Sequence, residues 1–387
     1  NDSTHYFRVS RWAVTDDPSE GPILDPTSEL VLIDQFDANR NHQGGAMFFG
    51  DDGFLYISTG DGGFTHSNAP SSRLSQRLDS ALMGGILRID VDMQGGSVSH
   101  PIRRHPNDSG LKASVQPPAG FWASTSANYY IPSDNPWADS SASSDVLEEF
   151  WAVGLRSPHT MQRDPVTGQI WIGDVGGSAE EIHLADEGDN FGWDYTNGGG
   201  QPQPNPLIGT NDPAILTISR SIGTCVIGGY VYRGTEFPSL VGKVLYGDHV
   251  KATVSALTYN PGGTSTPEFL CNFPTIGTKA GLANFCPGPN GEVFMTDLGG
   301  FTDSTNIEDN DGTIQRLAAA QVSPDAPPLL SQTGAFLDLA NLTPHPAFCA
   351  YDVLSPLWSD AATKDRWIAL PNDGVRDSLS EKIIYSE

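Results

Sequence analysis

A histidine and an aspartate stand at the two ends of one alternating apolar stretch, "NHQGGAMFFGDDGFLYISTGD", in which they are His42 and Asp61. If the two apolar runs pair as a hairpin, both side chains lie at the same end of it. A carboxylate that orients a histidine and raises its basicity produces a general base for the oxidation of an alcohol. The alternative is a structural pair, because most histidines in proteins are ordinary surface or core residues.

The strand that ends at Asp61 belongs to a pattern that occurs four times. Each copy has a turn with glycine, an alternating run rich in aromatic or β-branched residues, and a final aspartate. The copies are "DDGFLYISTGD" (51–61), "DPVTGQIWIGD" (164–174), "SLVGKVLYGD" (239–248) and "GPNGEVFMTD" (288–297). A recurring unit of turn, short strand and loop favours an all-β propeller with its aspartates at the mouth of the channel. A sandwich whose turns contain Asp and Gly is the alternative.

The charge of the chain limits its partners. Among 387 residues, 47 are acidic and 21 basic, which gives a formal net charge of −26. This charge repels nucleic acid and anionic membrane surfaces, and it makes oxygen-lined calcium sites plausible. No apolar run approaches the length of about 20 residues that spans a membrane. We therefore expect a periplasmic or secreted protein that binds no nucleic acid.

The four cysteines, Cys225, Cys271, Cys286 and Cys349, form no Cys-x-x-Cys motif, so neither a covalent haem nor a zinc ribbon is indicated. An even number of cysteines in an exported protein favours two disulfides, with Cys271 to Cys286 as the short loop. Four buried thiols are the alternative.

Longer motifs resemble a known family. "LMGGILRIDVD", "WAVGLRSPHTMQRDPVTGQIWIGDVGGSAEEIHLADEGDNFGWDY" and "GGYVYRGTEFPSLVGKVLYGDHV", together with the stretch around His42, are similar to the soluble quinoprotein glucose and aldose sugar dehydrogenases, a group that includes Hedgehog-interacting-protein-like propellers. The resemblance covers about residues 5–317. It implies a six-bladed propeller of four-stranded antiparallel blades that binds pyrroloquinoline quinone (PQQ) and calcium.

The resemblance also implies roles for particular residues. His42 falls on the catalytic base, Asp61 on its supporting carboxylate, and Arg156 on the arginine that polarises a quinone carbonyl. The implied reaction is oxidation of an aldose or related alcohol at the anomeric carbon, with hydride passing to PQQ. The positions that fall on cofactor contacts are Arg156, Ser157, His159 and Lys251. By the same resemblance, calcium is lined by Asp174, Val175, Gly176, Glu180 and Phe191.

The sequence departs from the family pattern at two places, and the second of them favours another hypothesis, a non-catalytic, calcium-stabilised propeller that binds a protein or glycan partner. Ser157 and His159 replace the family's asparagine and glutamine. Near "TKAGLANFCPGPNG" (278–291), the chain has no counterpart to the arginine pair that in the glucose enzymes binds the cofactor carboxylates, and Lys279 is the only cation in that stretch. Losing two such charge-assisted contacts weakens the recognition of a tricarboxylate.

The organisation of the chain is predicted in three parts. Residues 1–318 form the propeller, 319–330 a Pro/Ala-rich linker, and 331–387 the start of a second, truncated module. The resemblance begins partway through a first blade, so we expect most of that blade to lie in an upstream part of the same protein, which would be a partner of this chain. The other expected partners are a sugar and an electron acceptor such as a c-type cytochrome or a quinone.

Overall fold

The computed structural model describes residues 5–17, 19, 21–37, 41–63, 74–106, 127–138, 146–195, 207–273, 281–297, 312–318, 336–346, 348–350 and 367–369. Within these residues every regular element is a β-strand or a single turn of 3-10 helix. The all-β prediction is therefore confirmed. No helix in the described residues is long and apolar enough to cross a membrane.

The chain divides into two compact units, Asn1–Leu317 and Ala318–Glu387. In the second unit the described strands form two small antiparallel pairs. These are β22 (Phe336–Asp338) with β23 (Thr343–Pro344), and β24 (Phe348–Ala350) with β25 (Trp367–Ala369).

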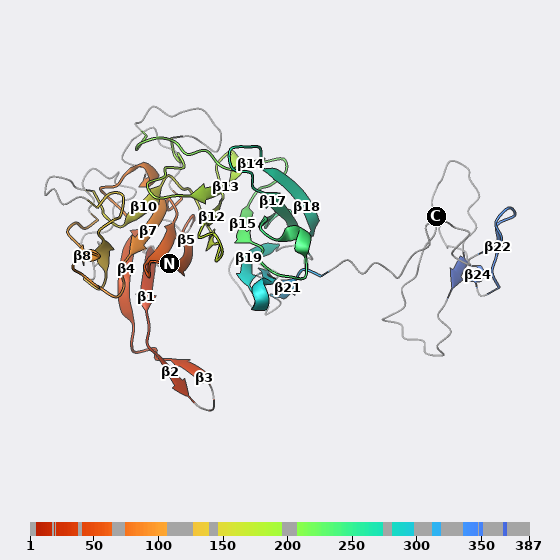
Figure 1. Ribbon diagram of the computed structural model, residues 1–387, viewed down its shortest axis with the longest axis horizontal. Helices are drawn as coiled ribbons and strands as arrows, with labels where there is room; N and C mark the ends of the chain where they lie inside the picture. Colours follow the sequence, from red (N-terminus) through yellow and green to blue (C-terminus); the bar gives the residue numbers. More distant parts are fainter. Residues whose placement is uncertain are drawn as a thin grey trace. The chain divides into compact units, whose positions relative to one another are not determined.

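The first unit is a series of antiparallel sheets that follow one another along the chain (Figure 1). The first sheet pairs β1 (His5–Arg11) with β4 (Leu30–Asp37). The second contains β5 (Gly44–Phe49), β6 (Leu55–Thr59), β7 (Gly85–Ile89) and β10 (Phe150–Val153). The third contains β11 (Thr160–Arg163), β12 (Ile170–Asp174), β13 (Ala179–Ala185) and β14 (Leu216–Ser219).

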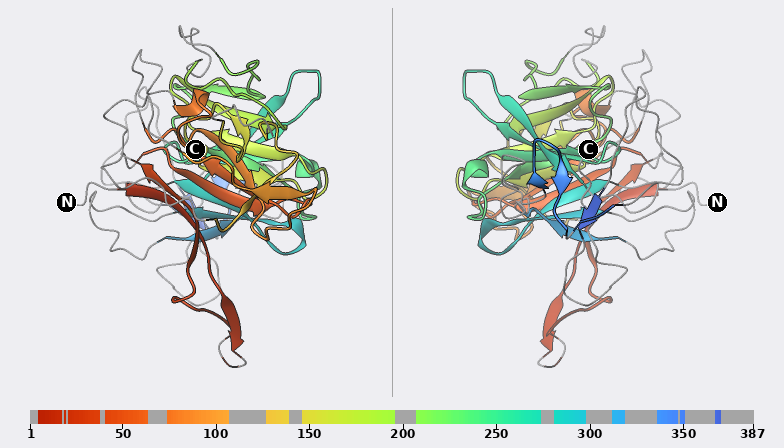
Figure 2. Two further views of the ribbon diagram at one scale, coloured as in Figure 1. Left: turned by 90° about the vertical axis from the view of Figure 1, so that its left-hand side faces the viewer. Right: turned by 90° about the vertical axis from the view of Figure 1, so that its right-hand side faces the viewer.

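The fourth sheet contains β15 (Val226–Val231), β16 (Val244–Asp248), β17 (Thr253–Thr258) and β18 (Thr266–Asn272). The fifth contains β19 (Leu282–Pro287), β20 (Val293–Asp297) and β21 (Ile314–Arg316). Smaller elements are β2 (Val14–Asp17) with β3 (Gly21–Leu24), β8 (Ser99–Pro101) with β9 (Tyr130–Pro132), and the 3-10 turns η2 (Leu74–Gln76), η4 (Pro238–Leu240) and η5 (Pro289–Gly291). The β2–β3 hairpin projects from the rest of its unit (Figure 2).

The sheets are arranged as propeller blades. The first strand of each sheet contacts the first strand of the next, β5 against β11, β11 against β15, and β15 against β19. These four strands therefore lie innermost, and the later strands of each sheet lie progressively further out. The propeller prediction is confirmed. In the second sheet, the stretch 51–61 supplies the second strand, β6, and β5 is the inner strand beside it.

The hydrophobic core lies between successive sheets. Strands alternate their side chains, so each blade presents one apolar row to the blade before it and another to the blade after it. Leu55 and Ile57 pack toward the first sheet, whereas Tyr56 between them packs toward the third. Trp171 likewise faces the fourth sheet, and its neighbours Ile170 and Ile172 face the second. Burial on both faces explains why the repeated strands are the most apolar segments of the chain.

The expected disulfide between Cys271 and Cys286 is absent, and Cys225, Cys271 and Cys286 are free thiols. Cys271 lies on β18, the outermost strand of the fourth sheet, and Cys286 lies on β19, the innermost strand of the fifth. Crossing a four-stranded blade takes three strand spacings, roughly 14 Å, which exceeds the separation of about 7 Å that a disulfide bridges. The predicted disulfide was wrong because it was inferred from the short separation of the two cysteines in the sequence.

Candidate active site

The inner hairpin of the second sheet brings His42 and Asp61 together. His42 precedes β5 and Asp61 follows β6, and the register Gly44 with Thr59 places both at one end of the antiparallel pair. The His42 Nδ1 to Asp61 Oδ1 distance is 2.7 Å. The Asp61 side chain is 6% exposed and that of His42 is 21% exposed. The His42 ring therefore remains accessible to a ligand, whereas the Asp61 carboxylate that binds it is buried.

The carboxylate of Asp61 is fixed by further donors. The Gly63 N–H donates to Oδ1 and the Trp193 indole N–H donates to Oδ2, both at 2.8 Å. With Nδ1–H of His42 donating to the same carboxylate, Nε2 is the ring nitrogen that carries a lone pair. The geometry therefore presents a histidine that can accept a proton at Nε2.

Arg156 joins this group through Trp193. Its guanidinium carbon lies 5.3 Å from the centre of the Trp193 ring, and its Nη1 donates to the carbonyl of Val175 at 2.6 Å. The Arg156 carbonyl accepts the Asp61 N–H at 2.8 Å. Four loops thus place His42, Asp61, Trp193 and Arg156 in one continuous network.

The repeated aspartates occupy equivalent positions in their blades, but the hydrogen-bond partner of Asp61 differs from those of Asp174 and Asp248. Asp61, Asp174, Asp248 and Asp297 each follow or end the second strand of a blade, and all are less than 8% exposed. Asp174 accepts the N–H groups of Arg156 at 2.9 Å and Ser157 at 2.6 Å. In the third and fourth blades the aspartate therefore anchors the backbone that enters the first strand of its own sheet. In the second blade, Asp61 is the aspartate at this position, and its carboxylate binds the imidazole of His42.

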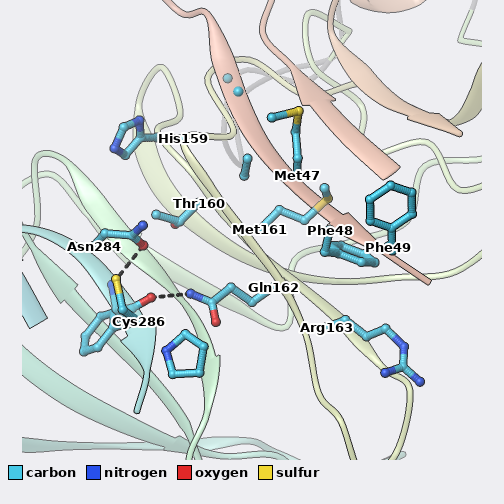
Figure 3. A pocket seen from close by; sticks show the side chains of 15 residues that line it. Met47, Phe48, Phe49, His159, Thr160, Met161, Gln162, Arg163, Asn284 and Cys286 are labelled. Atoms are coloured by element: carbon cyan, nitrogen blue, oxygen red, sulfur yellow. Dashed lines mark hydrogen bonds between the residues drawn. The ribbon is translucent and has the colours of Figure 1, made fainter. Parts of the chain in front are cut away.

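Lys251 and His159 lie near the same end of the propeller. Lys251 follows β16, and its N–H donates to Asp248 Oδ1 at 2.8 Å. His159 precedes β11 and lines a cavity of about 650 Å³ bounded by the inner strands β5, β11 and β19, where Met47, Gln162 and Cys286 are also placed (Figure 3). Withdrawal from water lowers the pKa of His159, and the nearby His249 adds to this effect.

Of the predicted calcium ligands, the structure brings the Gly176 carbonyl and Glu180 together, at Arg220. Successive side chains of β13 point to opposite faces, so Glu180 faces the fourth sheet while Asp174 and Glu181, which are paired in register, face the second. Glu180 is fully buried, and its Oε2 accepts the Val226 N–H at 2.9 Å. Phe191, predicted to bind calcium through its carbonyl oxygen, packs its ring on His183, with 4.5 Å between ring centres, a contact that does not involve that oxygen.

The other predicted oxygens already have cationic partners. The Val175 carbonyl is bound by Arg156, the Gly176 carbonyl by Arg220, and Glu180 forms an ion pair with Arg220. Calcium needs six or more free oxygens. In this arrangement the set does not fit a calcium ion, because arginine side chains contact three of the five predicted ligands.

A different set of polar side chains converges on the second-sheet face of β13. Ligand atoms of Asp174, Glu181 and His183 all lie within 4.8 Å of one another. Among the described residues, neither ring nitrogen of His183 has a hydrogen-bond partner. Burial raises the pKa of Asp174 to about 6. Nitrogen and oxygen ligands of this kind suit a transition metal better than calcium. The sequence analysis missed Glu181 and His183, although the two-residue period of "AEEIHLA" places them on one face.

Comparisons with known proteins agree with this architecture. Residues 119–272 match the sequence model of the family described as Glucose / Sorbosone dehydrogenase. The match covers about two fifths of the chain. The resemblance to glucose and aldose sugar dehydrogenases is therefore confirmed.

Individual relatives of the glucose/sorbosone dehydrogenase family are distant. The HIPL1 protein of Arabidopsis thaliana is 29% identical over 293 residues, covering 71% of this chain and 37% of the relative. Aldose sugar dehydrogenase YliI of Escherichia coli K12 is 25% identical over 216 residues, covering 54% and 45%. The Hedgehog-interacting protein of Mus musculus is 24% identical, covering 63% and 28%. The chain spans less than half the length of these curated relatives.

A solved structure titled as a glucose dehydrogenase superimposes with a TM-score of 0.53 at 18% identity, covering 82% of this chain and 79% of that one. At this level of identity the likeness concerns the fold, and it agrees with the propeller arrangement of the sheets.

Proposed function

We propose that the propeller unit is a quinoprotein oxidoreductase that oxidises an aldose or related alcohol at the anomeric carbon. The electrons then pass to a cytochrome or a quinone, and the protein works in the periplasm or outside the cell. The observation that carries this proposal is the His42 to Asp61 hydrogen bond, reinforced by Trp193 and placed beside Arg156.

Three residues of the chain have different roles in such a reaction. His42 Nε2 accepts the proton of the C1 hydroxyl, and Asp61 holds the ring so that this nitrogen faces the ligand. Asp61 also stabilises the imidazolium that forms, as a buried carboxylate does beside a catalytic histidine. Arg156 supplies positive charge where oxyanion character develops.

PQQ, when bound, supplies the hydride acceptor. The residues that would hold it are Arg156, Ser157, His159 and Lys251. Two of these are cations that lie at the same end of the blades, which suits a polycarboxylate ligand. Lys279, the only cation near the position of the missing arginine pair, lies outside the described residues. No step is assigned to calcium, because Arg156 and Arg220 occupy the oxygens predicted to bind it.

The test is a titration of the protein with PQQ, followed by addition of an aldose with a dye as electron acceptor. Replacement of His42 by alanine is expected to leave PQQ binding in place and to reduce sugar oxidation by about 10²- to 10⁴-fold, the usual contribution of a general base. His105→Ala, which removes an exposed histidine outside the network, is the matched control. Oxidation that survives His42→Ala unchanged contradicts the proposed base.

A second candidate function is a non-catalytic propeller that binds a protein or glycan. The observation in its favour is that two arginines, Arg156 and Arg220, hold the carbonyls of the 175–177 loop, which was predicted to carry the cofactor's metal. Absence of PQQ binding by the folded protein would favour this candidate. His42 and Asp61 would then belong to a ligand-binding surface.

A further inference from the structure

Arg220, which follows β14, directs two of its three guanidinium nitrogens at the loop between β12 and β13. Its Nη2 donates to the carbonyls of Gly176 and Gly177, the latter at 2.9 Å, and its Nε donates to Gly177 at 3.2 Å. Its Nη1 donates to the Thr224 carbonyl at 2.8 Å and forms an ion pair with Glu180 Oε1. One side chain thus gathers three carbonyl oxygens and one carboxylate.

The carboxylate in this group is costly to bury without a countercharge. The Glu180 side chain is 0% exposed, and burial raises its pKa, whereas Arg220 and the Val226 N–H act in the opposite direction. An isolated carboxylate in such a position is strongly unfavourable, and a cation paired with it offsets part of that cost. Arg220 is placed to do this, with its own side chain 36% exposed at the rim.

The oxygens that Arg220 binds belong to two blades. Gly176, Gly177 and Glu180 lie in the third sheet and its loop, whereas Thr224 leads into β15 of the fourth sheet. Glu180 adds a second link between the blades through Val226. A cation at this point therefore fastens one blade to the next.

Carboxylate and carbonyl oxygens gathered around one positive charge are also what calcium requires. Two of the residues predicted as calcium ligands, Gly176 and Glu180, contact Arg220, and a third, Val175, contacts Arg156. We propose that Arg220 is the resident cation of this junction, so that the propeller joins its third and fourth blades without calcium.

The test compares thermal unfolding of the full chain in a calcium chelator and in calcium. The wild-type protein is expected to unfold at the same temperature in both. Arg220→Ala is expected to unfold roughly 5–10 °C lower in chelator, because it leaves a buried carboxylate unpaired. Added calcium should restore part of that loss, since Glu180 and the loop carbonyls are then open to it.

Two further variants locate the effect. Arg316→Ala, which removes an exposed ion pair with Glu236, is the matched control and should respond neither to chelator nor to calcium. Adding Glu180→Gln to Arg220→Ala should abolish the calcium response, which separates this site from the Asp174, Glu181 and His183 cluster on the opposite face of β13.

A wild-type protein that loses stability in chelator and regains it with calcium overturns the proposal, as does an Arg220→Ala protein that calcium does not stabilise. If Arg220→Ala does not fold, the proposal is tested by two other measurements: the unfolding of the wild-type protein in chelator and in calcium, and the same comparison for Arg220→Lys. Arg220→Lys keeps the charge and should remain indifferent to calcium. None of these measurements depends on sugar oxidation, so the proposed enzymatic function can fail while this inference stands.

Discussion

At the scale of single residues, the same aspartate position performs different tasks in different blades. In the third and fourth blades, Asp174 and Asp248 accept backbone N–H groups and act as anchors. In the second blade, Asp61 accepts the ring of His42 and the indole of Trp193. The aspartates alone are therefore evidence of a repeated fold. The candidate chemistry rests on the histidine that one of them holds.

Glu149, a buried carboxylate outside the site, is expected to make the free energy of unfolding depend on pH. Burial raises the pKa of Glu149 from 4.5 to about 7, although the Tyr129 hydroxyl donates to it. The folded state therefore favours the protonated form. The resulting stabilisation is full below about pH 4.5 and is lost as pH rises through 7, a change of about 3 kcal/mol.

Glu149→Gln should remove this dependence, because the amide oxygen can still accept from Tyr129 and carries no charge. The free energy of unfolding, measured by denaturant titration from pH 5 to pH 8, should fall less steeply in the variant by about 3 kcal/mol. Glu187→Gln, at an exposed position, serves as the control. Parallel pH profiles for wild type and Glu149→Gln would show that Glu149 does not carry the effect.

At the scale of elements, the loops at one end of the blades approach closely and leave little space. The backbone N–H of Gly60 donates to the Gln43 carbonyl, and that of Asp61 donates to the Arg156 carbonyl. Gly60 therefore lies between the loop that carries His42 and the loop that carries Arg156. Its lack of a side chain allows the two loops to meet.

Gly60→Ala tests this close approach. A Cβ at this position would overlap the carbonyl oxygen of His42 and lie 2.9 Å from that of Arg156. We expect a loss of about 3 kcal/mol or more in the free energy of unfolding, since backbone atoms cannot rotate away from the methyl group. Gly263→Ala is the matched control, because the nearest atom to its Cβ would be 3.6 Å away. Equal stability of the two variants in denaturant titrations would rule out the crowding.

At the scale of the whole molecule, the dominant electrostatic feature is self-repulsion. A formal charge of −26 on 387 residues disfavours the compact state, and dissolved ions screen such repulsion within a Debye length of about 10 Å at 0.1 M salt. Buried pairs such as Arg220 with Glu180 are screened much less.

Raising the sodium chloride concentration from about 0.01 M to about 0.3 M should therefore raise the unfolding temperature by a few degrees, since the Debye length falls across this range. Differential scanning calorimetry at fixed pH measures this shift, and potassium chloride should reproduce it. An unfolding temperature that falls with either salt would mean that attractive surface pairs outweigh the repulsion.

The sequence by itself determined the repeated strands and the pairing of His42 with Asp61. Both follow from short-range pattern: alternation specifies a strand, and antiparallel pairing brings the residues flanking a hairpin to one end. The family motifs also lie in these segments. Such features need no knowledge of how distant parts of the chain meet.

The tertiary structure decided which of the remaining polar residues share a site. Adjacent residues Glu180 and Glu181 point to opposite faces of β13, so the first meets Arg220 and the second meets His183. Cys271 and Cys286 are close in sequence, but one lies on the outermost strand of the fourth sheet and the other on the innermost strand of the fifth. A four-stranded blade separates neighbours along the chain and joins distant residues, because contact is set by sheet packing rather than by sequence separation.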